Sequence, residues 1–160
     1  MTNKQLVTIN EYFDDLEVGD YFVSRSRTLT ETDIVMFSGL SGDYSPHHTD
    51  AEFAKRGPFG TIVAHGALIL SVATGLEFSL LGSADKIVGF YGMDRVRFVS
   101  PVPAGTTLYI HGTVQELTPK DKQRGIVSYL QEIRTHDDKV CVSMIKKSLN
   151  WTRGHTEMER

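Results

Sequence analysis

The sequence predicts an α+β fold in which one long apolar helix lies across a strongly curved antiparallel sheet. Two observations support this prediction. Residues 66–81 are apolar on nearly every side of a helix, so that helix must be surrounded by other elements. Most of the chain from residue 87 to residue 151 alternates between apolar and polar side chains, which is typical of half-buried strands. A curved sheet around one helix satisfies both burial requirements.

Composition and charge limit the classes of function and location. The chain has 160 residues, the usual size of a single domain. Its net charge of −3 argues against nucleic acid as the main partner, because phosphate backbones require a basic surface. We expect no membrane partner, since the uncharged residues 57–76 contain a proline and four glycines, which favours a buried helix. The first residues lack the apolar core of a signal peptide and Cys141 is the only cysteine, so we expect a reducing, cytoplasmic location.

The elements before the apolar helix are predicted from short-range patterns. Residues 21–29 alternate well enough to form a first strand. Residues 30–33, Thr-Glu-Thr-Asp, resemble a capping box and open a helix that should end near Gly39 or Gly42. Residues 49–52, Thr-Asp-Ala-Glu, resemble a second capping box that opens another short helix.

Four strands are expected after the apolar helix, over residues 87–99, 107–114, 125–134 and 139–151. One helix wrapped by such a sheet is the hot-dog arrangement. We therefore predict a single hot-dog domain over residues 12–151. A flexible N-terminal segment, residues 1–11, and a polar tail, residues 152–160, are expected to flank it.

The chemical groups gather in one stretch, residues 43–50, which reads Asp-Tyr-Ser-Pro-His-His-Thr-Asp. Asp43 and His48 flank a proline turn, so both side chains can point toward one water molecule and exchange protons near neutral pH. Downstream, Gly66 opens the apolar helix, and a glycine there offers backbone N–H groups to a developing negative charge.

These residues resemble the motif of the MaoC-like dehydratases, the family of (R)-specific enoyl-CoA hydratases. That motif runs Asp-x-Asn-Pro-x-His-x-Asp and is followed by a His-Gly that opens the central helix. The matching residues here are 43–50 and His65-Gly66, and Arg95-Val-Arg-Phe98 with the following Pro-Val-Pro-Ala-Gly loop extends the match. The resemblance covers roughly residues 12–117. It departs from the family at Ser45, where an Asn is usual.

The resemblance implies a site and a reaction. Asp43 and His48 would be the catalytic acid–base pair, and the Gly66 N–H would be the oxyanion donor. The reaction would be reversible, stereospecific hydration of trans-2-enoyl thioesters to (R)-3-hydroxyacyl thioesters. Coenzyme A or acyl carrier protein would carry the acyl group, and no cofactor would be needed. The residues expected to bind substrate are Tyr44, Ser45, Pro46, His65 and Thr74.

Simpler interpretations of the same residues stay open at this point. Asp43 also suits an ordinary turn before Pro46, and His48 could be a solvated turn residue. Asp50 fits a helix start better than catalysis. His65 can simply form a hydrogen bond within the core.

A metal site formed by His47, His48, Asp50 and His65 was the other chemical alternative. Adjacent histidines usually point apart, and the His-x-x-x-His spacing of a helical zinc site is missing from the sequence. We therefore expect no metal.

Three functions fit the predicted fold, because a fold alone does not determine function. Hydration of an enoyl thioester is favoured, since it requires both Asp43 and His48. A hot-dog acyl-CoA thioesterase needs a carboxylate but no paired histidine. A non-enzymatic acyl-thioester binding module needs neither. For all three we expect at least a homodimer, since one curved sheet leaves edges and apolar surface exposed.

Overall fold

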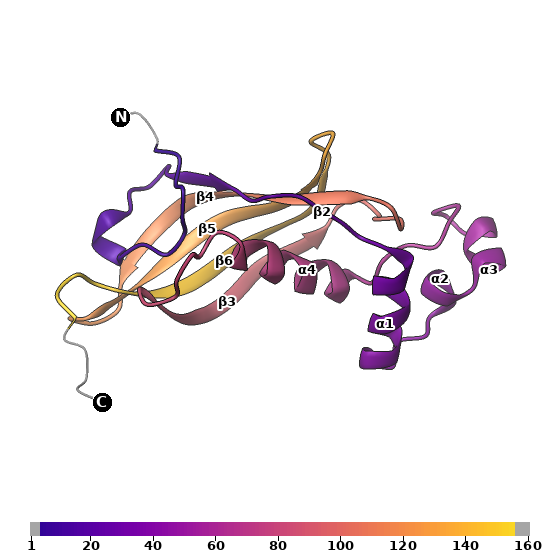
Figure 1. Ribbon diagram of the computed structural model, residues 1–160, viewed down its shortest axis with the longest axis horizontal. Coiled ribbons are helices and arrows are strands. Elements are labelled where there is room, and N and C mark those ends of the chain that lie inside the picture. The colour runs from indigo at the N-terminus through magenta and orange to yellow at the C-terminus, as the bar shows by residue number, and fades with distance from the viewer. Residues whose placement is uncertain (1–3, 156–160) are drawn as a thin grey trace.

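The computed structural model describes residues 4–155 and has the hot-dog arrangement: an antiparallel sheet curves around the helix α4 (Gly66–Phe78) (Figure 1). The strand order is β1-β4-β5-β6-β3, and β2 also pairs with β4. The strands are β1 (Tyr21–Val23), β2 (Arg27–Thr28), β3 (Ile87–Phe98), β4 (Thr107–Pro119), β5 (Arg124–Thr135) and β6 (Val140–Trp151). The predicted fold class and the four long strands are confirmed.

The helix α4 buries one face in the concave side of the sheet and leaves the other face open. Its buried apolar residues pack with residues of β4, β5 and β6 in one core; they are Leu68, Ile69, Val72, Ala73 and Leu76. The open face carries Ala67, Ser71, Thr74 and Phe78. The sheet of this chain therefore covers α4 on one side only, whereas the sequence predicted a helix surrounded on all sides. Across residues 4–155, no helix is long and apolar enough to cross a membrane.

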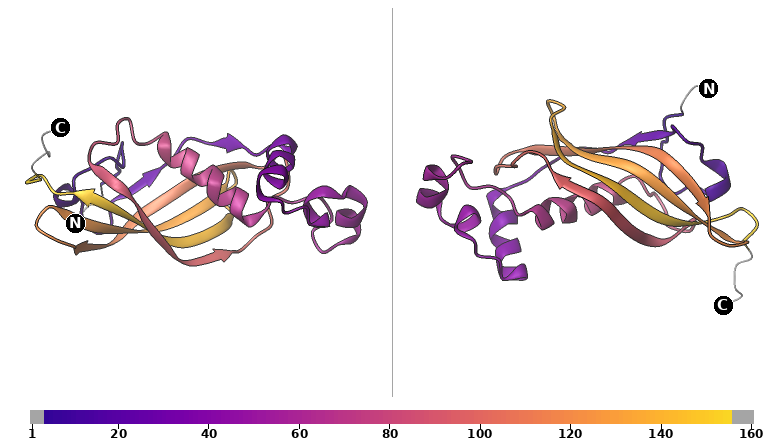
Figure 2. Two further views of the ribbon diagram at one scale, coloured as in Figure 1. Left: turned by 90° about the horizontal axis from the view of Figure 1, so that it is seen from below. Right: turned by 180° about the vertical axis from the view of Figure 1, so that it is seen from behind.

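Three short helices form a lobe beyond one end of the sheet, next to the start of α4 (Figure 2). They are α1 (Glu31–Ser41), α2 (Pro46–Thr49) and α3 (Ala51–Arg56). The first predicted capping box is confirmed, because the Thr30 hydroxyl accepts from the Asp33 N–H and the Asp33 carboxylate accepts from the Thr30 N–H. This box fixes the start of α1.

The second predicted capping box is wrong. The residue that caps α3 is Asp50, whose carboxylate accepts from the Phe53 N–H at 2.9 Å. Thr49 belongs to α2, and its hydroxyl donates to the carbonyls of Tyr44 and Ser45. Thr and Asp are both residue types that favour the capping position. Thr49 does not cap α3, because it is itself the last residue of α2.

The first predicted strand is divided into β1 and β2. At Ser24 the N–H donates to the Ile110 carbonyl, and the hydroxyl accepts from the Ile110 N–H, so a side chain takes over one ladder bond. The chain then leaves the ladder until Arg27. This detour places Arg25 and Ser26 beside the open face of α4.

The N-terminal segment differs from the flexible segment we expected. Leu6 and Ile9 are each 3% exposed and belong to the core, and the Ile9 N–H donates to the Leu80 carbonyl. Residues 4–11 are therefore packed against the domain, while residues 1–3 lie outside the described part of the chain. In the expected polar tail, the Thr152 N–H donates to the Gln123 carbonyl; residues 156–160 are likewise outside the described part.

Gly42 ends α1 in the left-handed conformation, with φ of 77°, directly before Asp43. We expect Gly42→Ala to lower the free energy of unfolding by about 1–2 kcal/mol, since a β-carbon is strained in this conformation. No heavy atom lies within 4 Å of the added carbon, so crowding does not contribute. Urea unfolding measures the loss. Gly42→Asn is the control and should lose less, because Asn tolerates this conformation better; equal stability of the wild type and both variants would contradict the argument.

Candidate active site

Asp43 lies on the connection between α1 and α2, and its carboxylate is held by the turn. One oxygen, Oδ1, accepts a hydrogen bond from the Ser45 N–H at 3.1 Å. The Asp43 N–H donates to the Ser41 hydroxyl at 3.2 Å. The other carboxylate oxygen has no hydrogen-bond partner within residues 4–155. The turn thus fixes Asp43 while leaving one oxygen available to a ligand.

His48 lies on α2, and a backbone carbonyl determines its tautomer. Its Nδ1 is 2.6 Å from the carbonyl oxygen of Val63. A carbonyl only accepts, so Nδ1 carries the proton. In the neutral imidazole Nε2 then keeps its lone pair, free to accept a proton or a hydrogen bond. The Val63 N–H donates in turn to the His47 carbonyl, which ties α2 to the segment before α4.

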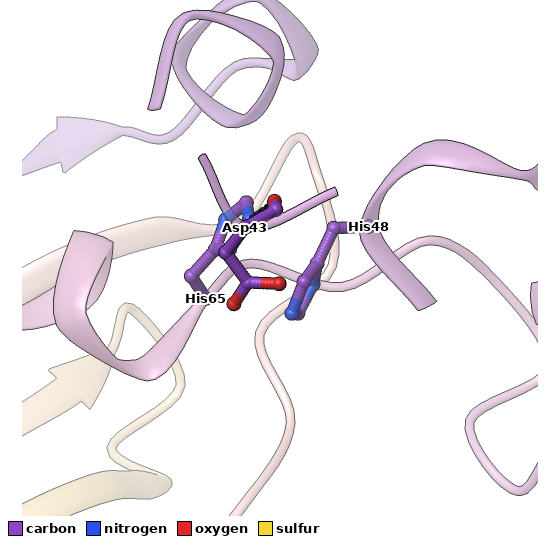
Figure 3. A group of neighbouring side chains, drawn as sticks. All are labelled: Asp43, His48 and His65. Atoms are coloured by element: carbon purple, nitrogen blue, oxygen red, sulfur yellow. Dashed lines mark hydrogen bonds between the residues drawn. The ribbon is translucent and has the colours of Figure 1, made fainter. Parts of the chain in front are cut away.

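His65 lies behind this pair and contacts both of its members (Figure 3). Its ring centroid is 3.7 Å from that of His48, and its Nε2 lies 3.0 Å from the Asp43 carbonyl oxygen. The same nitrogen is 3.3 Å from the hydroxyl of Ser38 on α1. The side chain is buried, with the residue 3% exposed. These contacts orient His65 toward the pair and the core of the lobe.

Gly66 is the first residue of α4, next to His65, whose imidazole lies against that of His48 at an interplanar angle of 31°. Its backbone is not in the left-handed region. Its N–H has no acceptor among the described residues, as expected in the first turn of a helix. The Phe98 ring lies close above it, so that a β-carbon at Gly66 would be 2.7 Å from a ring carbon. Glycine is required here by that close approach.

The other predicted site residues are spread around this centre. Ser45 contributes its N–H to Asp43, but its side chain caps nothing, and Pro46 begins α2. Tyr44 is 64% exposed. Thr74 lies on the open face of α4 beside a cavity of about 210 Å³, and its hydroxyl donates to the Ser71 carbonyl. Of these four residues, only Ser45 has a side-chain or backbone hydrogen bond to the acid–base pair in the described structure.

A family model described as the MaoC like domain matches residues 17–134, well over half of the chain. The chain belongs to the MaoC-like family. An (R)-specific enoyl-CoA hydratase of Rhodospirillum rubrum is 34% identical over 115 residues, covering 71% of this chain and 76% of that protein. The structure of a MaoC-like dehydratase from the same species has a TM-score of 0.81 at 27% identity, covering 91% of this chain and 99% of that one.

The alignments with several MaoC-like relatives cover only part of those proteins. Protein MaoC of Klebsiella aerogenes is 36% identical over 113 residues, which are 71% of this chain but 33% of that protein. For a 3-hydroxyacyl-thioester dehydratase of Mycobacterium tuberculosis, the matched part is 53% of its length. The chain thus spans a third to a half of the length of these relatives.

Three features of this MaoC-like site were not predicted from the sequence. They are the Val63 carbonyl that fixes His48, the Ser38 hydroxyl beside His65, and the Phe98 ring over Gly66. Each is a contact between residues that are distant in the sequence, rather than between residues of one motif. The only available signal was Phe98 itself, which belongs to the Arg95-Val-Arg-Phe98 match.

The four-residue metal cluster considered above does not form. The His47 ring packs against Phe53 and Phe59, away from His48, while Asp50 caps α3. Donor atoms of Asp43, His48 and His65 do lie within 4.8 Å of one another. Since His48 Nδ1 and His65 Nε2 face carbonyl oxygens, the remaining lone pairs lie on His48 Nε2, His65 Nδ1 and the free Asp43 oxygen. An acid–base pair also needs its lone pairs free, so this cluster does not by itself indicate a metal.

We therefore expect enoyl-thioester hydration to survive prolonged chelation and dialysis. An acid–base pair transfers protons without an ion. The measurement is turnover before and after treatment, with the metal content followed by elemental analysis. A loss of turnover that added zinc or magnesium restores would show that Asp43, His48 and His65 hold a metal.

Proposed function

We propose that this chain reversibly hydrates trans-2-enoyl thioesters to (R)-3-hydroxyacyl thioesters, with coenzyme A or acyl carrier protein as the carrier. The main support is the arrangement of Asp43 and His48 beside the start of α4. The relative named as an (R)-specific enoyl-CoA hydratase supports the substrate class. The reaction needs no cofactor, because water is the only other reactant.

In this proposal Asp43 and His48 hold the reacting water between the free carboxylate oxygen and Nε2. The pair takes one proton from the water as its oxygen bonds to C3, and it gives one proton to C2. One proton is accepted and one is returned, so the pair ends in its starting state. Because the donor atoms of Asp43 and His48 lie within 4.8 Å of one another, we expect the pair to deliver hydroxyl and proton to the same face of the double bond.

Electron density moves onto the thioester oxygen when C3 is attacked, and the Gly66 N–H is the proposed donor to that oxygen. The unpaired N–H groups of a helix start carry about half a positive charge in total, which favours a developing anion. The N–H is free among the described residues, and it is adjacent to His65, whose ring contacts that of His48. Phe98 covers this position and would limit the access of bulk water.

Mixing the pure protein with crotonyl-CoA tests the proposal. We expect the enoyl absorbance to fall without release of free thiol, and to stop at an equilibrium that is also reached from (R)-3-hydroxybutyryl-CoA. Release of free thiol would instead identify a thioesterase. No change with any chain length, despite measurable binding, would identify a binding module.

We also propose that the active form is at least a homodimer. β3 is the last strand of the sheet and has one unpaired edge within the described structure. Large apolar side chains are exposed near that edge and on the adjoining end of α4; they include Phe78 (72%), Phe90 (58%) and Tyr91 (47%). An unpaired edge beside an apolar surface favours association with another copy. The open face of α4 would then lie at or near the subunit contact.

Light scattering is expected to give a mass of at least twice the 17.9 kDa of the chain at micromolar concentration. Phe90→Glu should shift the protein toward the monomer, since it places a charge in the apolar contact. Val18→Glu is the control, because Val18 is 62% exposed and the next residue, Gly19, bonds to β4, on the other side of the sheet from β3. A stable, active monomer of the wild type would rule out the dimer.

A further inference from the structure

A cavity of about 210 Å³ lies between the last two turns of α4 and the first half of β3. Its walls include Phe78, Ile87 and Phe90, whereas Glu77 and Lys146 provide charged groups in its lining. The cavity is smaller than the roughly 300–1,000 Å³ pockets that enclose a whole drug-sized ligand. It therefore suits the end of a chain rather than an entire substrate.

The two charged residues form a buried ion pair. Glu77 is 9% exposed and Lys146 is 5% exposed, and Lys146 Nζ lies 3.2 Å from Glu77 Oε2. The ammonium also lies over the ring of Tyr129. Removing two such charges from water is costly, and a hydrocarbon pair of similar size is often at least as stable. A buried pair in a cavity wall therefore needs an explanation other than stability.

The cavity and the acid–base site lie at the two ends of one side of α4. β3 runs antiparallel to α4, since its last residue, Phe98, lies over Gly66, while Phe90 lies beside Thr74 in the cavity. Ala67, Leu70 and Thr74 follow one another along the side of α4 between these points. Thr74 is eight residues after Gly66, about 12 Å along the helix axis.

We infer that this cavity receives the distal end of the acyl chain and selects chains that carry a neutral hydrogen-bonding group there, such as a hydroxyl. This inference rests on the proposed hydration of enoyl thioesters. A hydroxyl can donate to the Glu77 carboxylate and accept from the Lys146 ammonium. A hydrocarbon end would cover both charges without replacing their contacts with water. A terminal carboxylate would bring a third charge to a buried pair that is already neutral, so it would lose its hydration without gaining a counter-charge of its own.

The test compares trans-2-enoyl-CoA substrates of increasing length, each with a methyl, hydroxyl or carboxylate end. At the length that reaches the cavity, we expect kcat/KM to be about 10–100-fold higher for the hydroxyl than for the methyl, the usual range when buried polar groups lose their partner. The substrate with a carboxylate end should have a lower kcat/KM than the substrate with a hydroxyl end. A preference for the methyl end at every length would overturn the inference.

The double variant Glu77→Leu/Lys146→Met should reverse the preference by making the cavity wall apolar. Asp94→Leu/Lys147→Met is the matched control: it removes a neighbouring ion pair between β3 and β6, whose Lys147 side chain is 31% exposed. The control should keep the preference for the hydroxyl. If the cavity variant folds and still prefers the hydroxyl end, the inference is overturned. If the variant does not fold, the comparison of hydroxyl and methyl ends in the wild type decides the question.

A binding measurement separates failure of this inference from failure of the proposed function. Calorimetry with saturated acyl-CoA molecules that carry a methyl or hydroxyl end requires no catalysis. If no enoyl substrate is hydrated but the hydroxyl end binds about tenfold more tightly, the hydratase proposal fails and the cavity assignment stands. If hydration occurs but neither turnover nor binding favours the hydroxyl, only the cavity assignment fails.

Discussion

Replacing Asp43 with Asn, or His48 with Asn, is expected to lower the hydration rate by about 10²–10⁴, the usual contribution of a general acid or base. Asparagine at position 48 has its amide nitrogen near the place of Nδ1, so it can still donate to the Val63 carbonyl while lacking Nε2. Asparagine at position 43 keeps an oxygen for the Ser45 N–H. Both variants should therefore fold normally. Steady-state turnover and circular dichroism measure the two effects.

The neighbouring histidine provides the control for this prediction. His47 packs against Phe53 and Phe59 rather than facing the pair, so His47→Asn should keep most of the activity. Because the pair acts as a unit, the double variant of Asp43 and His48 should be scarcely slower than the slower single variant. Turnover near the wild-type rate in either folded single variant would remove that residue from the mechanism.

In a Phe98→Ala background, which removes the ring that a β-carbon at position 66 would meet, Gly66→Pro is expected to lower turnover by about 10²–10³ while the protein stays folded, the usual cost of losing one oxyanion donor. Proline lacks the N–H but is tolerated in the first turn of a helix. The backbone here suits it: His65 has φ of −61° and ψ of 141°, the extended angles that a residue before proline adopts. Binding of a saturated thioester should weaken less than turnover, because the ground-state oxygen carries less charge.

Phe98 complicates the obvious control for Gly66→Pro. Gly66→Ala keeps the N–H but places a methyl group 2.7 Å from the Phe98 ring. We therefore compare Ala and Pro at position 66 in a Phe98→Ala background, where the added atoms have room. The alanine variant should turn over close to its Phe98→Ala parent, and the proline variant at least about a hundredfold more slowly. Equal turnover of the two would show that the donor is not the Gly66 N–H.

The parts of the fold that could be predicted are those in which neighbouring residues carry the signal. The apolar run of α4 and the alternation of β4 to β6 are such patterns, and so is the capping box at Thr30 and Asp33. The boundaries were less predictable. Thr49 and Asp50 are both good capping residues, and only the backbone of α2 shows which of them caps α3.

The hydrogen bonds that hold the site residues in place could not be predicted, because they join residues that are far apart in the sequence. His48 depends on a carbonyl fifteen residues away, and His65 depends on Ser38, twenty-seven residues away. The side chain of Glu77 marked the end of the uncharged run, but no nearby pattern indicated Lys146 on β6 as its partner. A motif can identify Asp43 and His48. The fold determines the tautomer of His48, the orientation of both side chains and the position of the Phe98 ring over Gly66.

The most direct test of the central claim is the stereochemistry of water addition in heavy water. If Asp43 and His48 handle both protons from one side, hydration of crotonyl-CoA should give (R)-3-hydroxybutyryl-CoA with one deuterium at C2 on the same face as the new hydroxyl. Nuclear magnetic resonance of the product resolves both centres. A product with the (S) configuration, or with deuterium on the opposite face, would contradict the account.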